Sequence, residues 1–247
     1  RGVDTSLFTP GSKDFFDLPR PVFLSMGRVA VEKNIEAFLA LDLPGSKVVV
    51  YGGGALGSTA ASILAQLFPT VDVAVIARHD AQAARAASTG AAVFQHEPGE
   101  ELVEALAEWS GATLRRPWEG LPCCYPGQID TLYDTIGSPL TCEVAMRVLR
   151  EQGALVQMGV SSPGRFEWTP WYFKELRLLG SNAFGRETFE GRTAHAFEHY
   201  FSLLQDGRID VSGILTHRFD LDDWRDAFTT IIGQGQTGAI KVAFDFR

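Results

Sequence analysis

Short apolar runs alternate with segments of helical periodicity along most of the chain. Residues 47–51 form a β-branched and aromatic run of the kind that is buried in a parallel sheet, and residues 56–68 carry apolar side chains at helical spacing. Pro69 and Thr70 end this helix, and residues 71–77 resume as a second apolar strand. The order strand, helix, strand predicts a β-α-β unit with parallel strands.

The same alternation continues downstream. Further helices are predicted over residues 80–88, 100–110, 139–151, 188–206 and 221–232. Further strands are predicted over residues 91–94, 129–133, 154–160, 176–180, 214–219 and 239–246. The segment 111–127 is rich in Pro and Gly and is predicted to be a long surface loop. The pattern indicates an α/β protein with a doubly wound parallel sheet that ends in a β-α-β tail.

A glycine-rich turn joins the first predicted strand to the first predicted helix. Gly52, Gly54 and Gly57 give the spacing G-x-G-x-x-G, and Ala55 and Leu56 lie where the helix begins. In a Rossmann fold the first glycine permits a tight turn, the second lets the backbone approach a pyrophosphate, and the third lets helix and strand pack closely. Helix N-terminal N–H groups then bind the anion. An incidental glycine turn is the alternative, and the strand-turn-helix context favours the dinucleotide site.

The end of the second predicted strand bears on the choice of cofactor. An acidic residue there would bind the adenosine ribose hydroxyls, but this chain has Ala77 and Arg78, and Asp72 lies at the other end of the strand. An arginine can pair with a 2′-phosphate in fork geometry, which favours NADP and leaves NAD open. A plain solvated charge is the alternative for Arg78.

Composition excludes several function classes. The 247-residue chain has a net charge of −8 and a pI of about 5.1, which argues against nucleic acid as the main partner. No apolar run approaches membrane-spanning length and no signal-peptide pattern opens the sequence, so we expect a cytoplasmic protein with no membrane association. Three cysteines, of which Cys123 and Cys124 are adjacent, allow neither a disulfide framework nor a four-cysteine zinc lobe.

From residue 47 onward the ordered series of motifs resembles the cofactor-binding domain and tail of the medium-chain, zinc-type alcohol dehydrogenases. The matching segments are the glycine turn, DTIGS at 134–138, GALVQMGV at 153–160, KELRLLGS at 174–181, FDLDDWRDAF at 219–228 and GAIKV at 238–242. The resemblance implies a cofactor domain over 47–212 and a tail over 213–247 that packs on a catalytic domain. It also implies a small alcohol, aldehyde or ketone as substrate.

The same resemblance places two loops beside the nicotinamide half of the cofactor. One holds Asp134, Thr135 and Ile136, and the other holds Gly159 and Val160. Such loops follow the carboxyl ends of parallel strands, where ligands bind in this class of sheet. For Asp134 and Thr135, an ordinary turn with a helix cap is an equally good interpretation.

The zinc ligands and the proton relay of that family belong to a separate N-terminal domain. Residues 1–46 contain neither Cys nor His, so we expect no zinc here and name no catalytic residue. His195 and His199 stand four residues apart near Glu198, but the predicted helix turns them away from Phe197 and Phe201, which favours a solvated face over a metal site.

The first 50 residues resemble instead the opening of the donor domain of two-domain retaining glycosyltransferases. Residues 22–26 and 34–41 are predicted as a strand and a helix, and Arg28 and Lys33 are placed like the residues that bind a sugar-nucleotide diphosphate in those enzymes. The acceptor-binding half of that site has no counterpart in the sequence. Surface charges are therefore favoured for both residues.

Three hypotheses of function follow. The first is an oxidoreductase unit that binds a nicotinamide dinucleotide. The second is a non-catalytic dinucleotide-binding or assembly module that forms a homo-oligomer through aromatic residues at Trp168, Trp171, Tyr172 and Phe173. Packing of these aromatic side chains over the sheet is an equally good interpretation. The third is a sugar-nucleotide transferase fragment that depends on Arg28 and Lys33.

Overall fold

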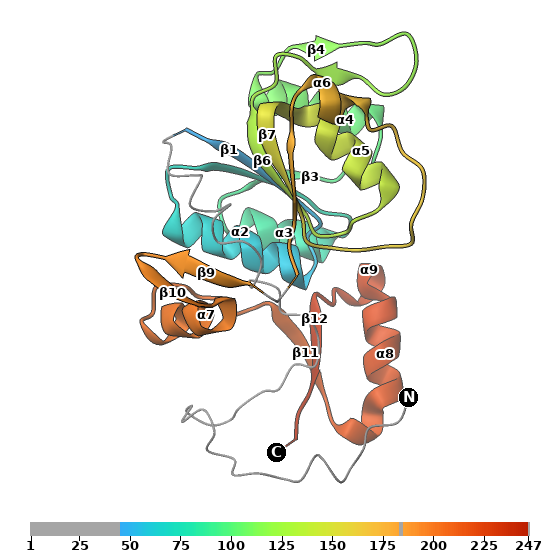
Figure 1. The fold of residues 1–247 in the computed structure, drawn as a ribbon. Helices are drawn as coiled ribbons and strands as arrows, with labels where there is room; N and C mark the ends of the chain where they lie inside the picture. The colour runs from blue at the N-terminus through green and yellow to red at the C-terminus, as the bar shows by residue number, and fades with distance from the viewer. Residues whose placement is uncertain (1–44, 183–184, 247) are drawn as a thin grey trace.

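A six-stranded parallel sheet forms the centre of the molecule. The computed structural model describes residues 45–182 and 185–246 (Figure 1). The strands of the sheet are β1 (Lys47–Tyr51), β2 (Asp72–Ile76), β3 (Ala92–Phe94), β6 (Ile129–Asp134), β7 (Leu149–Gln157) and β8 (Arg177–Gly180). Their spatial order is β3-β2-β1-β6-β7-β8, and every neighbouring pair is parallel. This is the doubly wound Rossmann order, so the predicted fold class is confirmed.

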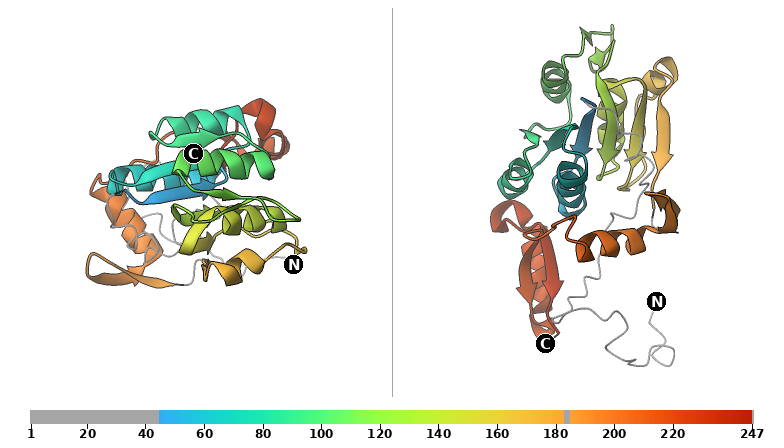
Figure 2. Two further views of the ribbon diagram at one scale, coloured as in Figure 1. Left: turned by 90° about the horizontal axis from the view of Figure 1, so that it is seen from above. Right: turned by 90° about the vertical axis from the view of Figure 1, so that its left-hand side faces the viewer.

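Helices cover both faces of this sheet (Figures 1 and 2). Val48 and Val50 of β1 pack in a core with α2 (Ala55–Leu67) and α3 (Asp80–Ala87). Val49 and Tyr51 point to the opposite face and pack with α4 (Glu100–Ser110) and α5 (Pro139–Val148). Successive strand residues alternate between faces, so a wholly apolar strand fits only a sheet that is covered on both sides. Burial of each of these valines stabilises the fold by about 1.5–3 kcal/mol.

Part of the predicted surface loop 111–127 is ordered as a hairpin, so that prediction was wrong. The strands β4 (Leu114–Arg115) and β5 (Cys123–Cys124) pair antiparallel, and Cys124 is fully buried in the core next to α4 and α5. Two-residue strands are too short to show an alternating pattern. The dense Pro and Gly content therefore concealed them.

The helix predicted over 139–151 ends earlier, at Val148, where β7 begins. The buried Nζ of Lys174, just after the short helix α6 (Thr169–Phe173), donates hydrogen bonds to the carbonyl oxygens of Arg147 and Leu149 at 2.7 and 2.6 Å. A cation at a helix C-terminus binds carbonyls that have lost their helical partners. The helix end is thus set by a residue that is distant in sequence.

The long helix predicted over 188–206 was also wrong in its first half. Residues there form a hairpin of β9 (Arg186–Phe189) and β10 (Arg192–His195), and only α7 (Ala196–Gln205) is helical. Glu190 and Gly191 join the strands with φ values of 50° and 78°. Two successive positive φ angles are those of the hairpin turn whose twist matches paired strands.

The end of the chain forms a small unit of its own that projects from one end of the sheet (Figure 2). It comprises β11 (Leu215–Phe219), a 3-10 turn (Leu221–Asp223), α8 (Trp224–Ile232), α9 (Gln234–Thr237) and β12 (Lys241–Phe244). The two strands pair in parallel, as the predicted β-α-β tail requires. The predicted strand and helix at 22–26 and 34–41, with Arg28 and Lys33, lie outside the described residues.

Candidate functional site

A cavity of about 490 Å³ opens at the carboxyl ends of β1, β2 and β6. Its wall comprises Tyr51 to Leu56 from the glycine turn, Ile76, Arg78, His79 and Gln82 around the start of α3, His96 to Pro98 after β3, Thr135, Ile136, Ser138 and Thr141 around the start of α5, and Gln234 from the tail. The crossover between the two halves of the sheet lies between β1 and β6, at the floor of this cavity. Ligands of doubly wound proteins bind at this point.

The three glycines of the turn differ in what surrounds them. Gly52 has a φ of +108°, and a Cβ there would lie 2.3 Å from Thr135 Oγ1. A Cβ at Gly57 would lie 1.7 Å from the carbonyl oxygen of Gly52, so the start of α2 packs directly on the turn. A Cβ at Gly54 would meet no atom of residues 45–182 and 185–246 within 4 Å. The first and third glycines are therefore required by the fold, whereas Gly54 faces open space.

The N-terminus of α2 points its free donors at that space. Gly54 is the N-cap, and its carbonyl accepts the first helical hydrogen bond from Ser58 N–H at 2.8 Å. The N–H groups of Ala55 and Leu56 precede that bond and have no helical acceptor. No acidic side chain lies in the first turn of α2. The partial positive charge at the N-terminus of α2 therefore faces the opening at Gly54, where no Cβ fills the space. Such an arrangement suits an anion.

The side chain of Asp134 builds the loop after β6. It is fully buried, its Oδ1 accepts hydrogen bonds from the N–H groups of Ile136 and Gly137 at 2.9 Å, and its Oδ2 accepts one from Thr141 Oγ1 at 2.8 Å. The N-cap of α5 is Ser138, whose side chain accepts a hydrogen bond from Thr141 N–H. Asp134 is not among the residues that line the cavity, and its contacts hold the loop that does.

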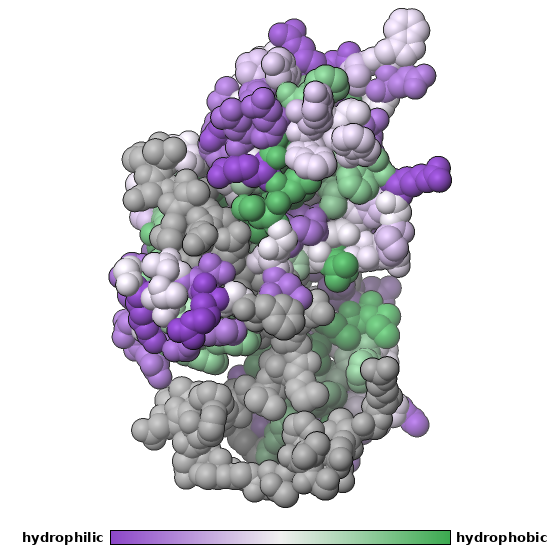
Figure 3. All heavy atoms as spheres, in the orientation of Figure 1, coloured by the Kyte–Doolittle hydropathy of each residue, from purple (hydrophilic) through white to green (hydrophobic). Residues whose placement is uncertain are grey.

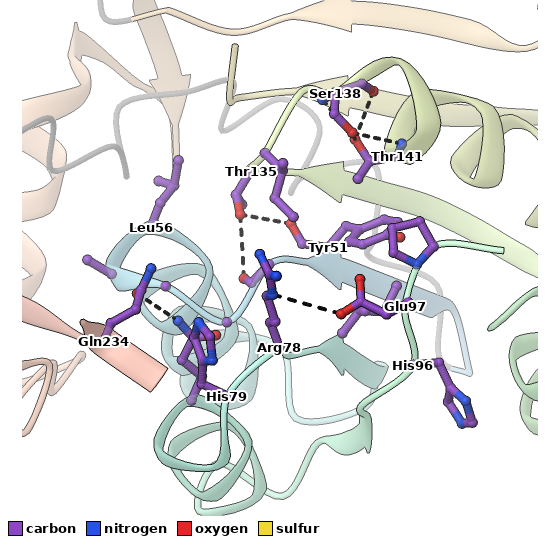
Figure 4. Close-up of a pocket in the computed structure, with 18 residues that line it drawn as sticks. Tyr51, Leu56, Arg78, His79, His96, Glu97, Thr135, Ser138, Thr141 and Gln234 are labelled. Carbon is purple, nitrogen blue, oxygen red and sulfur yellow. Dashed lines mark hydrogen bonds and ion pairs between the residues drawn. The ribbon is translucent and has the colours of Figure 1, made fainter. Parts of the chain in front are cut away.

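Thr135 connects this loop to the glycine turn (Figure 4). Its N–H and its Oγ1 both donate to the carbonyl oxygen of Tyr51, at 3.0 and 2.8 Å. Gly159 packs behind the same loop, because a Cβ there would lie 2.3 Å from Thr135 O. Val160 follows with 77% of its surface exposed, and neither Gly159 nor Val160 lies in the wall of this cavity.

Arg78 lies at the mouth of the cavity, directly after β2 (Figure 4). Its Nε is 3.8 Å from Glu97 Oε1, and both side chains are more than three-quarters exposed. An exposed pair at this distance contributes little stability, so Arg78 is free to exchange its partner. Asp72 begins β2 at the far end of the strand, as the sequence indicated.

Two glutamines at the mouth were missed by the sequence analysis. Gln82 Nε2 of α3 donates to Gln234 Oε1 of α9 at 3.2 Å, which ties the C-terminal unit to the unit built around the six-stranded sheet (Figure 4). The two residues are 152 positions apart. No local sequence pattern predicts such a pair, because only the packing of the tail brings α9 to α3.

Clusters of side chains that could bind a metal ion are absent from the described ranges. No group of three or more His, Cys, Asp or Glu side chains in residues 45–182 and 185–246 could hold an ion. His199 is buried, and its Nε2 lies 3.0 Å from the carbonyl oxygen of Glu187, while Phe197 and Phe201 are exposed. The predicted orientation of this helix was therefore wrong, since the hairpin covers the histidine face.

Within residues 45–182 and 185–246 no helix has both the length and the apolar character needed to cross a bilayer.

A family model described as zinc-binding dehydrogenase matches residues 55–198, more than half of the chain. The chain belongs to the zinc-binding dehydrogenase family. This confirms the resemblance to medium-chain alcohol dehydrogenases, whereas nothing supports a glycosyltransferase relationship for the first 50 residues.

Relatives of this family match most of the chain. The L-threonine 3-dehydrogenases of Shewanella sp. (strain W3-18-1) and Shewanella baltica (strain OS185) are each 25% identical, over 216 and 214 residues, and the match covers 85% of this chain and 55% of theirs. The chain therefore spans about half the length of these relatives.

Solved structures share the fold. A short chain alcohol dehydrogenase from E. coli CFT073, complexed with NADH, matches with a TM-score of 0.62 and 23% identity over 82% of this chain and 53% of that one. Alcohol dehydrogenase TADH from Thermus sp. ATN1 matches with a TM-score of 0.63 and 21% identity over 86% of this chain and 54% of that one.

Proposed function

We propose that this chain binds a nicotinamide dinucleotide and forms the cofactor-binding part of an oxidoreductase that acts on a small alcohol, aldehyde or ketone. The observation that carries the proposal is the open space at Gly54, beside the free N–H groups at the start of α2. Family membership supports the oxidoreductase class. The cofactor supplies the hydride chemistry, and the protein positions it.

The residues around the cavity suggest how the cofactor would lie. The pyrophosphate would bind over Gly54, Ala55 and Leu56, and the adenosine ribose would lie beside Arg78. The nicotinamide would extend toward Ile136 and Val160, as the family resemblance implies. The loops would be shaped by five residues whose contacts are with neighbouring protein atoms, namely Gly52, Gly57, Asp134, Thr135 and Gly159.

NADP is the favoured cofactor, with NAD as the alternative. An arginine stands where an acidic residue would bind ribose hydroxyls, and its present partner Glu97 holds it only weakly. A 2′-phosphate offers the guanidinium a charged, bidentate partner.

Binding of the dinucleotide is proposed to be independent of zinc. Reduction of a carbonyl needs a group that polarises its oxygen, and the part of the chain that the structure describes offers no cluster of metal ligands. We therefore propose a cofactor domain over residues 47–212 and a tail over 213–247 that packs on a catalytic domain. No catalytic residue is assigned.

Titration of the 247-residue chain with NADPH and with NADH, followed by nicotinamide fluorescence, tests the proposal. Saturable binding is expected, with NADPH the tighter ligand. Absence of binding of both at high micromolar concentration would contradict it.

A non-catalytic assembly module is the second candidate, and exposed aromatic side chains favour it. Trp168, Trp171, Tyr172 and Phe173 are all exposed, and Figure 3 shows apolar surface over the nearby edge of the sheet, where Leu178 of β8 is also exposed. Such a patch suits self-association of the chain as a homo-oligomer. Dinucleotide binding without turnover on any of a panel of alcohols and aldehydes, together with a dimer in sedimentation, would favour this candidate.

A further inference from the structure

The hydroxyl of Tyr51 is buried at the edge of the cavity without a hydrogen-bond partner among the described residues. Tyr51 ends β1, its surface is only 2% exposed, and it belongs to the wall of the cavity as well as to the core beneath α4. A buried hydroxyl without a partner destabilises a fold, and phenylalanine would fill the same space without that penalty. The position of the hydroxyl therefore points to a partner that arrives from outside the chain.

Neighbouring polar groups do not compete for that partner. Ser138 and Thr141, the other hydroxyls at this side of the cavity, bond to each other at 3.1 Å, and Thr141 donates to Asp134. Thr135 uses its hydroxyl on the carbonyl oxygen of Tyr51 itself. Among the described hydroxyl groups that line the cavity, that of Tyr51 is the one left to meet a ligand.

The protonation state of Tyr51 suits hydrogen bonding with a neutral nucleobase. Burial, together with the carboxylates of Asp134 and Glu97, raises the pKa of this phenol well above its ordinary value. The group therefore stays neutral at every pH at which the protein is handled. A neutral phenol both donates and accepts one hydrogen bond.

Apolar residues line the same cavity as Tyr51. Ile76, Pro98 and Ile136 contribute apolar wall, and Arg78 lies at the mouth. If the ribose of the adenosine lies beside Arg78, its base is the part of the ligand that enters between these apolar residues. Adenine carries acceptor nitrogens and one amino donor on its edges.

We propose that the Tyr51 hydroxyl hydrogen-bonds to an edge of the adenine base and so helps to select adenine nucleotides. This inference rests on the proposed function, and it adds a residue that sets the specificity for the base. In the family resemblance Tyr51 contributes only to the strand before the glycine turn.

The variant Tyr51→Phe removes one oxygen atom and keeps the ring. Calorimetric titrations of the wild type and the variant would use NADPH, AMP and nicotinamide mononucleotide. We expect the variant to bind NADPH and AMP about tenfold more weakly, the equivalent of one hydrogen bond, and to bind nicotinamide mononucleotide as the wild type does. Without ligand, the variant should melt at the same temperature as the wild type or higher, because an unpartnered hydroxyl has been removed.

Three outcomes would overturn the inference, and they separate it from the proposed function. If the wild type binds NADPH and the variant binds it equally well, the hydroxyl does not contact the base and the proposed function stands. If the variant melts lower and loses affinity for all three ligands alike, Tyr51 has a structural role only. If the wild type binds neither NADPH nor NADH, both proposals fail together.

Discussion

Gly57 packs against Gly52 so closely that a Cβ at Gly57 would lie 1.7 Å from the carbonyl oxygen of Gly52. Gly54, two residues after Gly52, has no atom of the described residues within 4 Å of the equivalent position. One pattern of glycines therefore holds two positions that the fold confines and one that it leaves open. The two kinds of position can be separated by mutation.

Gly57→Ala should destabilise the protein by about 2–4 kcal/mol, because backbone must move to admit the methyl group. Gly54→Ala should leave the free energy of unfolding within about 1 kcal/mol of the wild type, since its φ of −68° suits alanine. The same variant should bind NADPH at least tenfold more weakly, because its methyl group would occupy the place of the pyrophosphate. Thermal melts and fluorescence titration would check both; a Gly54→Ala variant with normal affinity would remove the pyrophosphate from this turn.

Arg78→Gln should reduce the affinity for NADPH about tenfold or more and leave the affinity for NADH nearly unchanged, because a charge-assisted bond to the 2′-phosphate is lost. The contrast between the two cofactors should shrink at high salt, since both partners are exposed. Arg192→Gln removes an exposed arginine of β10 that pairs with Glu198 of α7; it is the matched control and should change neither affinity. Equal weakening of NADH and NADPH by Arg78→Gln would contradict the assignment of Arg78 to the phosphate.

Removal of metal should leave cofactor binding intact. Dialysis against a chelator is expected to leave the NADPH dissociation constant and the melting temperature unchanged, because the described residues hold no cluster of metal ligands. Metal analysis of the purified chain would accompany the titration. A stoichiometric zinc ion, or a melting temperature that falls on chelation, would show that the expectation of no zinc was wrong.

Two thiols should be inert in the folded protein at pH 8. Burial raises the pKa of Cys124 to about 11, and burial together with the nearby Asp134 carboxylate raises that of Cys142 to about 12. Because only a thiolate reacts rapidly, a colorimetric thiol reagent should reach both groups only after denaturant is added. Rapid labelling of Cys124 without denaturant would show that the β4–β5 hairpin opens.

The same two thiols should make the protein less stable in alkali. Each folded-state pKa lies above its ordinary value of 9.0, so the unfolded chain releases these protons first. Their contribution to stability is fully present below pH 9 and is lost as the pH rises from there toward 11–12. Urea melts at pH 8 and pH 10 would measure the loss, and Cys142→Ala should reduce the difference between them.

The sequence located all six strands of the sheet because most of them contain a short apolar run between clear breaks, although β7 begins at Leu149 and ends at Gln157, and does not span 154–160 as predicted. Buried parallel strands need no partner-specific pattern, so β1 and β2 could be placed within one or two residues. The β9–β10 hairpin was missed because Phe189 and the residues of α7 together imitate helical spacing. Glu190 at positive φ is an uncommon turn residue, and pairing of the two strands decided the outcome.

Some parts of the candidate site could be predicted from the sequence and others could not. The glycine turn, Arg78 and the loop after β6 could be located, because each follows a strand and strand ends gather at one edge of a parallel sheet. The sequence could not show that Asp134 would turn inward to bind N–H groups, or that Gln234 would reach the mouth of the cavity. Those outcomes depend on which buried donors lack partners and on how the tail packs.

By itself, then, the sequence determined the fold class, the family and the place of the glycine turn, because these depend on local periodicity and on backbone that only glycine allows. Tertiary structure alone decided which of the glycines is confined by neighbouring atoms and which faces an opening among the described residues. It also decided that the Tyr51 hydroxyl is buried at the cavity with no partner in the part of the chain that the structure describes. The surroundings of the glycines and of the Tyr51 hydroxyl depend on atoms a few ångströms away, and residues distant in sequence supply many of those atoms.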